Sequence, residues 1–222
     1  MIVLGIETSS RWSGVALTAE KGPLGEFHLQ EGGRTEHLHL LMVRLVEAAG
    51  LTPLSIGGVA VSLGPGSFTG LRIGIGAAKG ISLATGCPVV GVPLVPLLAE
   101  AVIPWEGETA VWIDAGRGEV FGALYRMGEE ASAGRTAPPE EHLRRLGRGE
   151  TLFVGTGALR YRDLVEQEMG GRARFLERRR SFPDASRVAR WGRELLLSGA
   201  ADGIDNLEPL YLREVDARPA RG

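Results

Sequence analysis

Hydrophobic and polar positions along the chain follow two periods, one typical of strands and one typical of helices. Short runs rich in Val and Ile, separated by Ser, Gly and Pro, predict strands. Apolar residues that recur three and four positions apart predict helices. The predicted strands are Ile2–Glu7, Gly14–Thr18, Gly25–Gln30, Val59–Leu63, Pro88–Val92, Ala110–Asp114, Glu119–Tyr125 and Thr151–Val154. The predicted helices are Leu38–Ala49, Leu71–Ala84, Pro139–Leu146, Gly157–Met169 and Ser186–Leu197. Strands that alternate with helices place the chain in the α/β class.

The order of these elements repeats in the second half of the chain. The run Val3–Glu7 ends on an acid after isoleucine, and a turn leads from it into the apolar run Gly14–Leu17. The run Val111–Asp114 ends in the same way and is also followed by a second apolar strand. Such self-similarity predicts two duplicated lobes, residues 1–104 and residues 105–222. The small and polar residues between these strands and the next helix, Gly128–Pro138, are predicted to form an exposed loop.

Composition and charge narrow the class of protein. The 222 residues are 44% hydrophobic and 23% charged, which is the balance of a globular chain. A single cysteine, Cys87, excludes an internal disulfide and favours a reducing, cytoplasmic location. A net charge of −2 argues against binding nucleic acid by bulk charge alone. The uncharged run Gly80–Ala99 contains several glycines and prolines, so it predicts buried elements, among them a helix begun by Pro93, rather than a membrane span.

Two predicted helices have features typical of a partner-binding surface. On the first, Leu40 and Val43 lie off the core-facing stripe, so they are either tolerated surface residues or part of a second apolar face. On the second, small and apolar residues share one face, which fits either tight packing on the sheet or the close approach of a partner helix. The residues of this stripe are Gly70, Gly74, Ala77, Ile81 and Ala84.

The segment Gly64–Gly70 lies between a predicted strand and a predicted helix, where backbone N–H groups can bind an anion. It lacks the Gly-Lys-Ser/Thr ending of a Walker A loop. Within it, Gly64, Gly66 and Ser67 are candidates for phosphate contacts. The alternative is a tight structural turn.

Glu7 and Asp114 each end a predicted strand beside a turn of small residues. In two-lobed phosphotransferases such acids position a metal–nucleotide or a water across a cleft, and Ser9 and Gly155 could also contact the nucleotide. The alternative is that both acids accept hydrogen bonds from turn amides. We predict no metal site, because side chains two residues apart, such as His37 and His39, cannot share a metal on one helical face.

Arginine is concentrated near the end of the second half, where residues 172–193 hold eight arginines against two acids. The run Arg178, Arg179 and Arg180 lies at the centre of this segment. Arginine suits contacts to a phosphate backbone, so a tRNA contact is one interpretation. A solvated turn and helix face is the other.

Three motifs together resemble a known family. They are Gly5-Ile6-Glu7-Thr8-Ser9, Ser62-Leu63-Gly64-Pro65-Gly66-Ser67-Phe68-Thr69-Gly70-Leu71-Arg72-Ile73-Gly74 and Ala78-Lys79-Gly80. They resemble the bacterial TsaB (YeaZ) family, a component of the tRNA threonylcarbamoyladenosine machinery. The segments Asp114–Phe121 and Pro209–Arg213 are also similar to that family. The resemblance implies a two-lobed actin/Hsp70-like (ASKHA, ribonuclease-H-like) fold with duplicated mixed-sheet lobes.

The catalytic relative of that family, TsaD, has a metal-binding His-x-x-x-His after the strand that follows the shared helix. Here the corresponding positions are Leu94 and Leu98, and leucine cannot ligate a metal. The resemblance therefore implies a non-catalytic scaffold or activator without metal or cofactor of its own. It would pair with a TsaD-type subunit and a TsaE-type ATPase for threonylcarbamoyl transfer to the adenosine next to the anticodon.

The same resemblance leaves several points open. It implies that tRNA is bound through the complex and that ATP could lie at the partner interface, and it allows a homodimer of the isolated protein. The alternative from another class is an ASKHA-fold ATPase or small-molecule kinase that uses Glu7 and Asp114.

Overall fold

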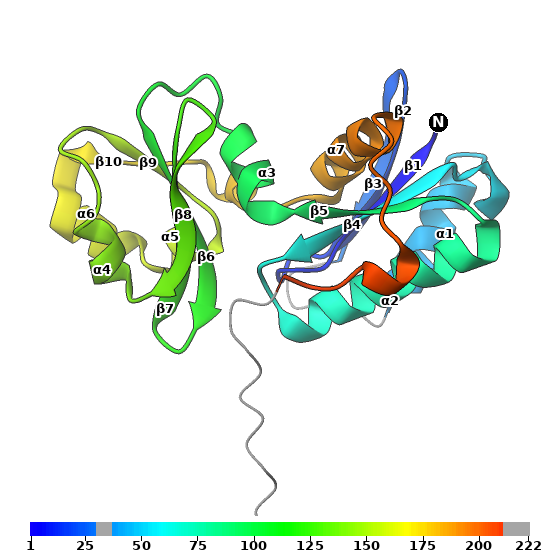
Figure 1. The fold of residues 1–222 in the computed structure, drawn as a ribbon, viewed down its shortest axis with the longest axis horizontal. Coiled ribbons are helices and arrows are strands. Elements are labelled where there is room, and N and C mark those ends of the chain that lie inside the picture. Colours follow the sequence, from blue (N-terminus) through cyan, green and yellow to red (C-terminus); the bar gives the residue numbers. More distant parts are fainter. Residues whose placement is uncertain (30–36, 211–222) are drawn as a thin grey trace, which may run out of the picture.

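In the computed structural model, which describes residues 1–29 and 37–210, the chain forms two lobes, each built on a five-stranded sheet (Figure 1). The strands of the first sheet are β1 (Val3–Glu7), β2 (Gly14–Ala19), β3 (Gly22–His28), β4 (Gly58–Gly64) and β5 (Val89–Pro93). Those of the second are β6 (Glu108–Gly116), β7 (Glu119–Arg126), β8 (Glu129–Ala137), β9 (Thr151–Val154) and β10 (Ala173–Phe175).

The two sheets have the same topology. The first has the order β3-β2-β1-β4-β5 and the second the order β8-β7-β6-β9-β10. In each, three consecutive strands pair antiparallel, and the fourth strand of the lobe lies parallel to its first. The predicted α/β class and the predicted duplication of mixed-sheet lobes are confirmed.

The helices fill the outer layers and the region between the sheets. They are α1 (Leu38–Ala48), α2 (Phe68–Thr85), α3 (Leu94–Glu100), α4 (Pro139–Leu143), α5 (Thr156–Arg160), α6 (Arg162–Met169) and α7 (Ala185–Leu197). Short 3-10 helices are η2 (Pro53–Ser55), η3 (Gly170–Arg172), η4 (Arg178–Ser181) and η5 (Ile204–Asn206). No helix in the described part of the chain is long and apolar enough to cross a membrane.

Side chains of the first sheet alternate between two covered faces, as the two-residue period of a strand requires. Leu4 and Ile6 lie in a core cluster with residues of α1 and α2. Val3 and Ala60 lie on the opposite face, in a cluster that includes Val188 of α7. The first sheet is therefore a layer between helices on both sides.

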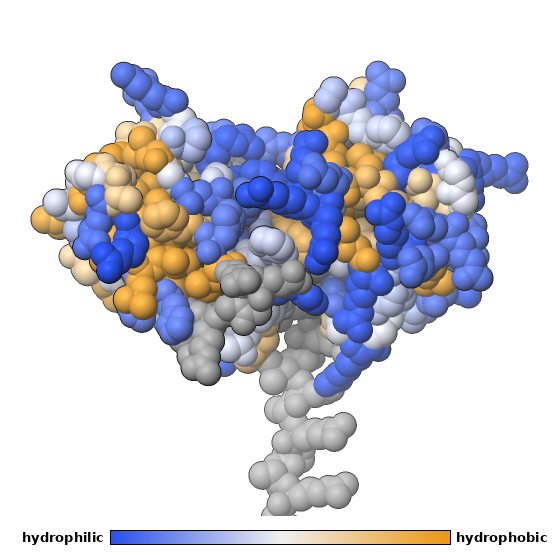
Figure 2. All heavy atoms as spheres, turned by 180° about the vertical axis from the view of Figure 1, so that it is seen from behind, coloured by the Kyte–Doolittle hydropathy of each residue, from blue (hydrophilic) through white to orange (hydrophobic). Residues whose placement is uncertain are grey.

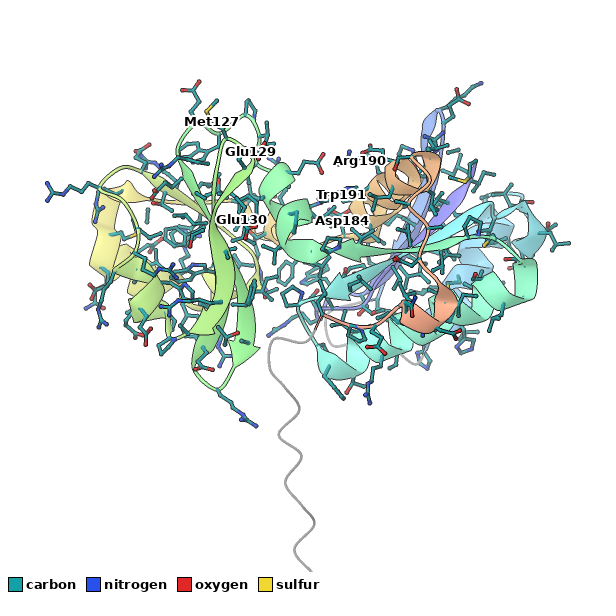
Figure 3. All side chains as sticks on the ribbon, in the orientation of Figure 1. Met127, Glu129, Glu130, Asp184, Arg190 and Trp191 are labelled. Atoms are coloured by element: carbon teal, nitrogen blue, oxygen red, sulfur yellow. The ribbon has the colours of Figure 1, made fainter. Side chains whose placement is uncertain are left out.

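Helix α7 returns the chain to the first lobe. It packs against β1, β2, β4 and β5, and Figure 3 shows Arg190 and Trp191 on this helix, across the molecule from Met127 on the β7–β8 hairpin. Beyond it, Leu210 donates its backbone N–H to the carbonyl of Leu63. The assignment of everything after residue 104 to the second lobe is therefore wrong for residues 185–210. An amphipathic helix must cover an apolar face, and the face of the first sheet opposite α1 and α2 supplies it.

Two local predictions are also wrong. The predicted loop Gly128–Pro138 contains the edge strand β8, whose exposed small and polar side chains give no apolar alternation. The predicted helix Gly157–Met169 is split at Tyr161 into α5 and α6. The last residue of the strand predicted to reach Gln30 lies outside the described residues, as do residues 211–213 of the C-terminal motif.

Candidate functional site

A cleft of about 660 Å³ lies between the two lobes. The first lobe lines it with the turn after β1, the loop before α2 and one side of α3. The second lobe lines it with the end of β6, the α5–α6 region and η4. The cleft is the part of the structure where most of the sequence-predicted nucleotide residues meet.

Glu7 ends β1 and is fully buried. Its Oε1 accepts hydrogen bonds from the backbone N–H of Ser9 at 2.6 Å and from the Ser9 hydroxyl at 2.5 Å. Burial raises the pKa of Glu7 to about 7, and the hydrogen bonds from Ser9 oppose that shift. Ser9 lines the cleft, but Glu7 lies behind it, so Glu7 does not face Asp114 across the cleft.

Asp114 lies near the end of β6 and lines the cleft. Its Oδ1 accepts the backbone N–H of Gly116 at 3.0 Å, and its Oδ2 accepts Nη1 of Arg160 at 2.7 Å. Its own N–H donates to the hydroxyl of Thr156 at 3.1 Å. Each lobe thus has an acid that binds the amide two residues later, which is the structural alternative that the sequence left open.

The glycine-rich loop before α2 is braced on the turn after β1. The N–H of Ser67 donates to the carbonyl of Ser9 at 2.7 Å, and the Ser67 hydroxyl accepts the N–H of Gly70 at 3.2 Å to cap α2. A Cβ on Gly66 would meet the Ser9 carbonyl. Gly66 and Ser67 line the cleft, but the Ser67 N–H is already used by the protein, which favours the structural turn over a phosphate cradle.

Gly64 and Gly155 are not among the residues that line the cleft. Gly155 precedes α5 with φ 105°, and a Cβ there would overlap the carbonyl of Trp112. Glycine at this position lets α5 approach β6 closely, so its role in the structure is packing.

Leu94 and Leu98 lie on α3, fully buried at the cleft. Their hydrocarbon side chains have no lone pair to offer a metal. Within residues 1–29 and 37–210, no group of three His, Cys, Asp or Glu side chains is placed to hold a metal ion.

The small-residue stripe predicted on α2 faces inward at its first turns. Gly70 and Gly74 are buried, and a Cβ on either would overlap Thr8. Their placement at a partner interface is wrong, because the close approach they allow is that of α2 to the turn after β1. Ala77 and Ile81 are half-buried against the core of the first lobe.

The outward face of α2 has residues that the sequence reasoning missed. A Cβ on Gly76 or Gly80 would meet no neighbour within 4 Å, and Leu83 is 72% exposed. These positions follow Arg72 at helical spacing, so a charged residue on the helix marked its solvent side in the sequence. On α1, Leu40 and Val43 are 52% and 53% exposed, as expected for residues off the core stripe.

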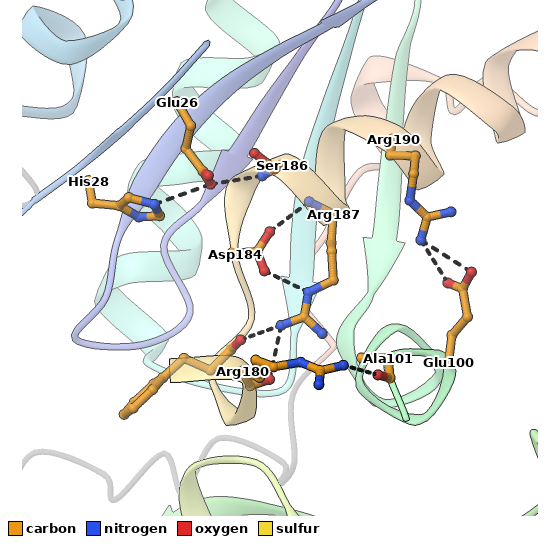
Figure 4. Close-up of polar contacts among 10 residues, drawn as sticks. Glu26, His28, Glu100, Ala101, Arg180, Asp184, Ser186, Arg187 and Arg190 are labelled. Atoms are coloured by element: carbon orange, nitrogen blue, oxygen red, sulfur yellow. Dashed lines mark hydrogen bonds and ion pairs between the residues drawn. The ribbon is translucent and has the colours of Figure 1, made fainter. Parts of the chain in front are cut away.

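The three consecutive arginines of η4 divide between two cavities. Arg178 lines the cleft, whereas Arg179 and Arg180 line a second cavity of about 310 Å³ beside it. Arg180 donates from Nη2 to the carbonyl of Ala101 at 3.1 Å (Figure 4). The cleft also holds arginines that sequence reasoning did not select, namely Arg11, Arg160 and Arg162.

Sequence comparison identifies the family. A family model described as TsaD, tRNA N6-adenosine threonylcarbamoyltransferase, matches residues 33–220. The tRNA threonylcarbamoyladenosine biosynthesis protein TsaB of Escherichia coli (strain K12) is 32% identical over 225 residues, which cover 96% of this chain and 95% of that relative. This chain belongs to the TsaB (YeaZ) family. Its family role is therefore in tRNA threonylcarbamoyladenosine biosynthesis.

Solved structures support the TsaB assignment and the fold. YeaZ from Pseudomonas aeruginosa superposes with a TM-score of 0.72 at 27% identity and covers 95% of this chain and 100% of its own. The activator of the 2-hydroxyisocaproyl-CoA dehydratase from Clostridium difficile, with bound ADPNP, gives a TM-score of 0.52 at 11% identity, over 90% of this chain and 97% of its own. The second likeness concerns the fold alone. The predicted two-lobed ASKHA fold is confirmed.

Proposed function

We propose that this protein is a non-catalytic subunit that binds a TsaD-type transferase and activates threonylcarbamoyl transfer to the adenosine next to the anticodon of tRNA. The observation that carries the proposal is the pair Leu94 and Leu98, which line the cleft where the catalytic relative would have metal ligands. Hydrocarbon side chains there can neither hold a metal nor polarise a threonylcarbamoyl group. The activity would then have to reside in the partner.

The outer face of the first lobe supports the pairing. We define this docking face by the exposed residues Leu40, Val43, Gly76, Gly80 and Leu83 of α1 and α2. Both helices cover the same side of the first sheet (Figure 1). Exposed apolar side chains beside glycines without neighbours allow a partner helix to approach closely. The half-buried Ala77 and Ile81 lie at its inner edge.

Further partners enter through the complex in this proposal. A TsaE-type ATPase and tRNA would join the pair, and ATP would be bound at the interface between subunits rather than by this chain alone. An ATPase or small-molecule kinase that uses Glu7 and Asp114 is supported less well. Glu7 is buried behind the Ser9 turn, and Asp114 is paired with Arg160.

A reconstituted transfer reaction tests the proposal. The TsaD-type transferase, TsaE-type ATPase, tRNA and a threonylcarbamoyl donor are incubated with and without this protein, and modified adenosine is quantified. We expect transfer only when this protein is present, and none from this protein without the transferase. Modification by this protein alone, or equal modification in its absence, would overturn the proposal.

A further inference from the structure

Two arginine-lined cavities adjoin each other at the junction of the lobes. The cleft and the smaller cavity share Phe182 and Pro183 as a common ridge. The cleft is lined by Arg11, Arg160, Arg162 and Arg178, and the smaller cavity by Arg179, Arg180 and Arg187. In a protein whose net charge is −2, seven arginines of the described part of the chain thus line one continuous surface. Figure 2, which shows the molecule of Figure 1 from behind, has hydrophilic side chains gathered between the two lobes.

The acids on this surface already have partners within the protein. Asp114 pairs with Arg160, and Asp184 accepts Nε of Arg187 at 2.6 Å. Glu26 lies 3.3 Å from Nε2 of His28, and this contact raises the pKa of His28 (Figure 4). Arg162 also pairs with Glu166, which is not among the cleft-lining residues. Among the described residues, seven arginines against these four acids leave a local charge of +3. A guanidinium has five N–H donors, so an arginine with one ion pair can bind a further anion. Arg187 is more fully engaged, because its Nη2 also donates to the carbonyls of Arg180 and Phe182.

Apolar and aromatic side chains lie between the positive charges. The rings of Trp12 and Phe182 lie 5.7 Å apart at the ridge, and Trp12 lines the smaller cavity. In the cleft, Leu94, Leu98 and Ile113 belong to the wall, although all three side chains are buried. A groove that combines arginines with aromatic and apolar surface is typical of sites for single-stranded nucleic acid, in which phosphates meet the charges and bases meet the rings.

We propose that these two cavities together form a binding track for a single-stranded segment of RNA. The proposal rests on the proposed function only in that tRNA is the substrate of the complex. A strand is favoured over a free nucleotide because the arginines continue past the ridge, where the consecutive residues Arg178 and Arg179 line different cavities. A mononucleotide would fill one cavity, whereas a strand can place successive phosphates in both.

Binding along this track does not need a divalent cation. Sites for Mg²⁺-bound nucleotides use carboxylates to hold the metal. Among the described residues that line the cleft, Asp114 is the one acid, and Arg160 already neutralises it. Arginines take the place of the metal in this track, so RNA binding is expected to be unchanged by EDTA and to weaken steeply with salt.

The test measures the fluorescence anisotropy of a labelled single-stranded RNA of about 12 nucleotides, a length within the site size of such grooves, titrated with the full chain in EDTA. The double variant Arg178→Ala with Arg179→Ala removes one arginine from each cavity. We expect about 10-fold weaker binding and a salt slope smaller by about 1.4, which is 0.7 for each lost phosphate contact on a single strand. Thermal unfolding of the variant checks that it folds as the parent does.

A matched control removes the same charge elsewhere. Arg144 and Arg148 are exposed and line neither cavity, so Arg144→Ala with Arg148→Ala is expected to leave affinity within about 2-fold. Equal losses in both double variants, or unchanged binding by the first, would overturn the proposal. So would a result in which ATP binds the cleft and the RNA does not, since that outcome identifies a mononucleotide site.

One variant distinguishes an error in the proposed RNA-binding track from an error in the proposed function. The Arg178→Ala/Arg179→Ala variant is also tested for co-elution with the TsaD-type transferase, whose docking face is on α1 and α2. Loss of RNA binding with intact co-elution supports the track. Intact RNA binding in this variant overturns the track and leaves the pairing with the transferase unaffected.

Discussion

Arg160 donates a hydrogen bond from Nη1 to Oδ2 of Asp114 at 2.7 Å, and this ion pair lies at the cleft between the lobes. The other carboxylate oxygen of Asp114 accepts the N–H of Gly116. The carboxylate that a phosphotransferase of this fold would turn towards a metal-bound nucleotide or a water is therefore engaged on both oxygens by the protein itself.

From this pairing we predict that the isolated protein does not hydrolyse ATP. Release of phosphate from Mg²⁺–ATP is expected to equal the buffer background, both for the parent protein and for Asp114→Asn. The reason is that both carboxylate oxygens of Asp114 are already engaged within the protein, and that Glu7 is fully buried and does not line the cleft. Magnesium-dependent turnover that Asp114→Asn abolishes would contradict this.

The raised pKa of Glu7 should make the stability of the protein depend on pH. Burial raises its pKa from 4.5 to about 7, so the folded protein binds the carboxyl proton more tightly than the unfolded chain does. The resulting contribution to the free energy of unfolding is complete below pH 4.5 and is lost as the pH rises through 7. The loss amounts to about 3 kcal/mol, at 1.36 kcal/mol for each unit of pKa.

The variant Glu7→Gln isolates this effect. The amide oxygen can still accept the hydrogen bonds of Ser9, but the side chain cannot ionise. Urea unfolding at pH 5 and pH 8 is expected to show that Glu7→Gln raises stability relative to the parent at pH 8 and not at pH 5. Glu47→Gln, on the exposed side of α1, serves as the control and should give parallel curves. If Glu7→Gln differed from the parent by the same free energy of unfolding at pH 5 and at pH 8, the raised pKa of Glu7 would be refuted.

Replacing either of two glycines of α2 by alanine is expected to change the stability of the protein in opposite directions. Gly76→Ala is expected to stabilise the protein by about 0.5–1 kcal/mol, because its Cβ meets no neighbour and alanine favours the helix. Gly74→Ala places a Cβ against the hydroxyl of Thr8, and such overpacking costs about 1–3 kcal/mol. Thermal unfolding of the two variants provides the comparison. Equal midpoints would show that Gly74 does not contact the turn after β1.

Asp184 caps the N-terminus of α7 and is expected to stabilise this helix. Its Oδ1 accepts the N–H of Arg187 at 2.7 Å, which satisfies a donor that would otherwise be unpaired at the start of the helix. Asp184→Ala is expected to lower the free energy of unfolding by about 1 kcal/mol, the usual effect of losing such a cap. Asp184→Asn retains an oxygen acceptor and should lose less. Chemical denaturation of both variants measures the difference.

The order of strands and helices could be predicted because strongly apolar strands and amphipathic helices have clear periods. The acid that ends β1 and the acid near the end of β6 also revealed the duplication, since each is followed by a turn and a returning strand. Strand β8 was missed because an edge strand with small polar side chains has no apolar alternation. The antiparallel pairing with β7 holds this segment in the sheet, and that pairing leaves no pattern in the sequence.

The candidate site depended on tertiary placement that periodicity does not determine. The amphipathic period of α7 predicts an apolar face but not that this face covers the first sheet. The small residues of α2 indicated that another segment approaches this helix closely. Only the structure shows that the neighbour at Gly70 and Gly74 is Thr8 and not a partner protein. Arg11 and Arg160 are far apart in the sequence, and the duplicated fold brings them to one cleft.

The docking face can be tested with variants that keep the fold. Leu40→Glu with Leu83→Glu introduces two charges on exposed positions of α1 and α2, so the monomer is expected to unfold at the same temperature as the parent. Ile103→Glu with Met127→Glu provides the matched control, because these exposed apolar residues lie outside the docking face.

If this protein acts by binding a TsaD-type transferase through the docking face, the two proteins sediment together when the purified components are mixed. We expect a complex for the parent protein and for Ile103→Glu with Met127→Glu, and separate species for Leu40→Glu with Leu83→Glu. Separate species for the parent protein, or an intact complex for the docking-face variant, would contradict binding through the docking face.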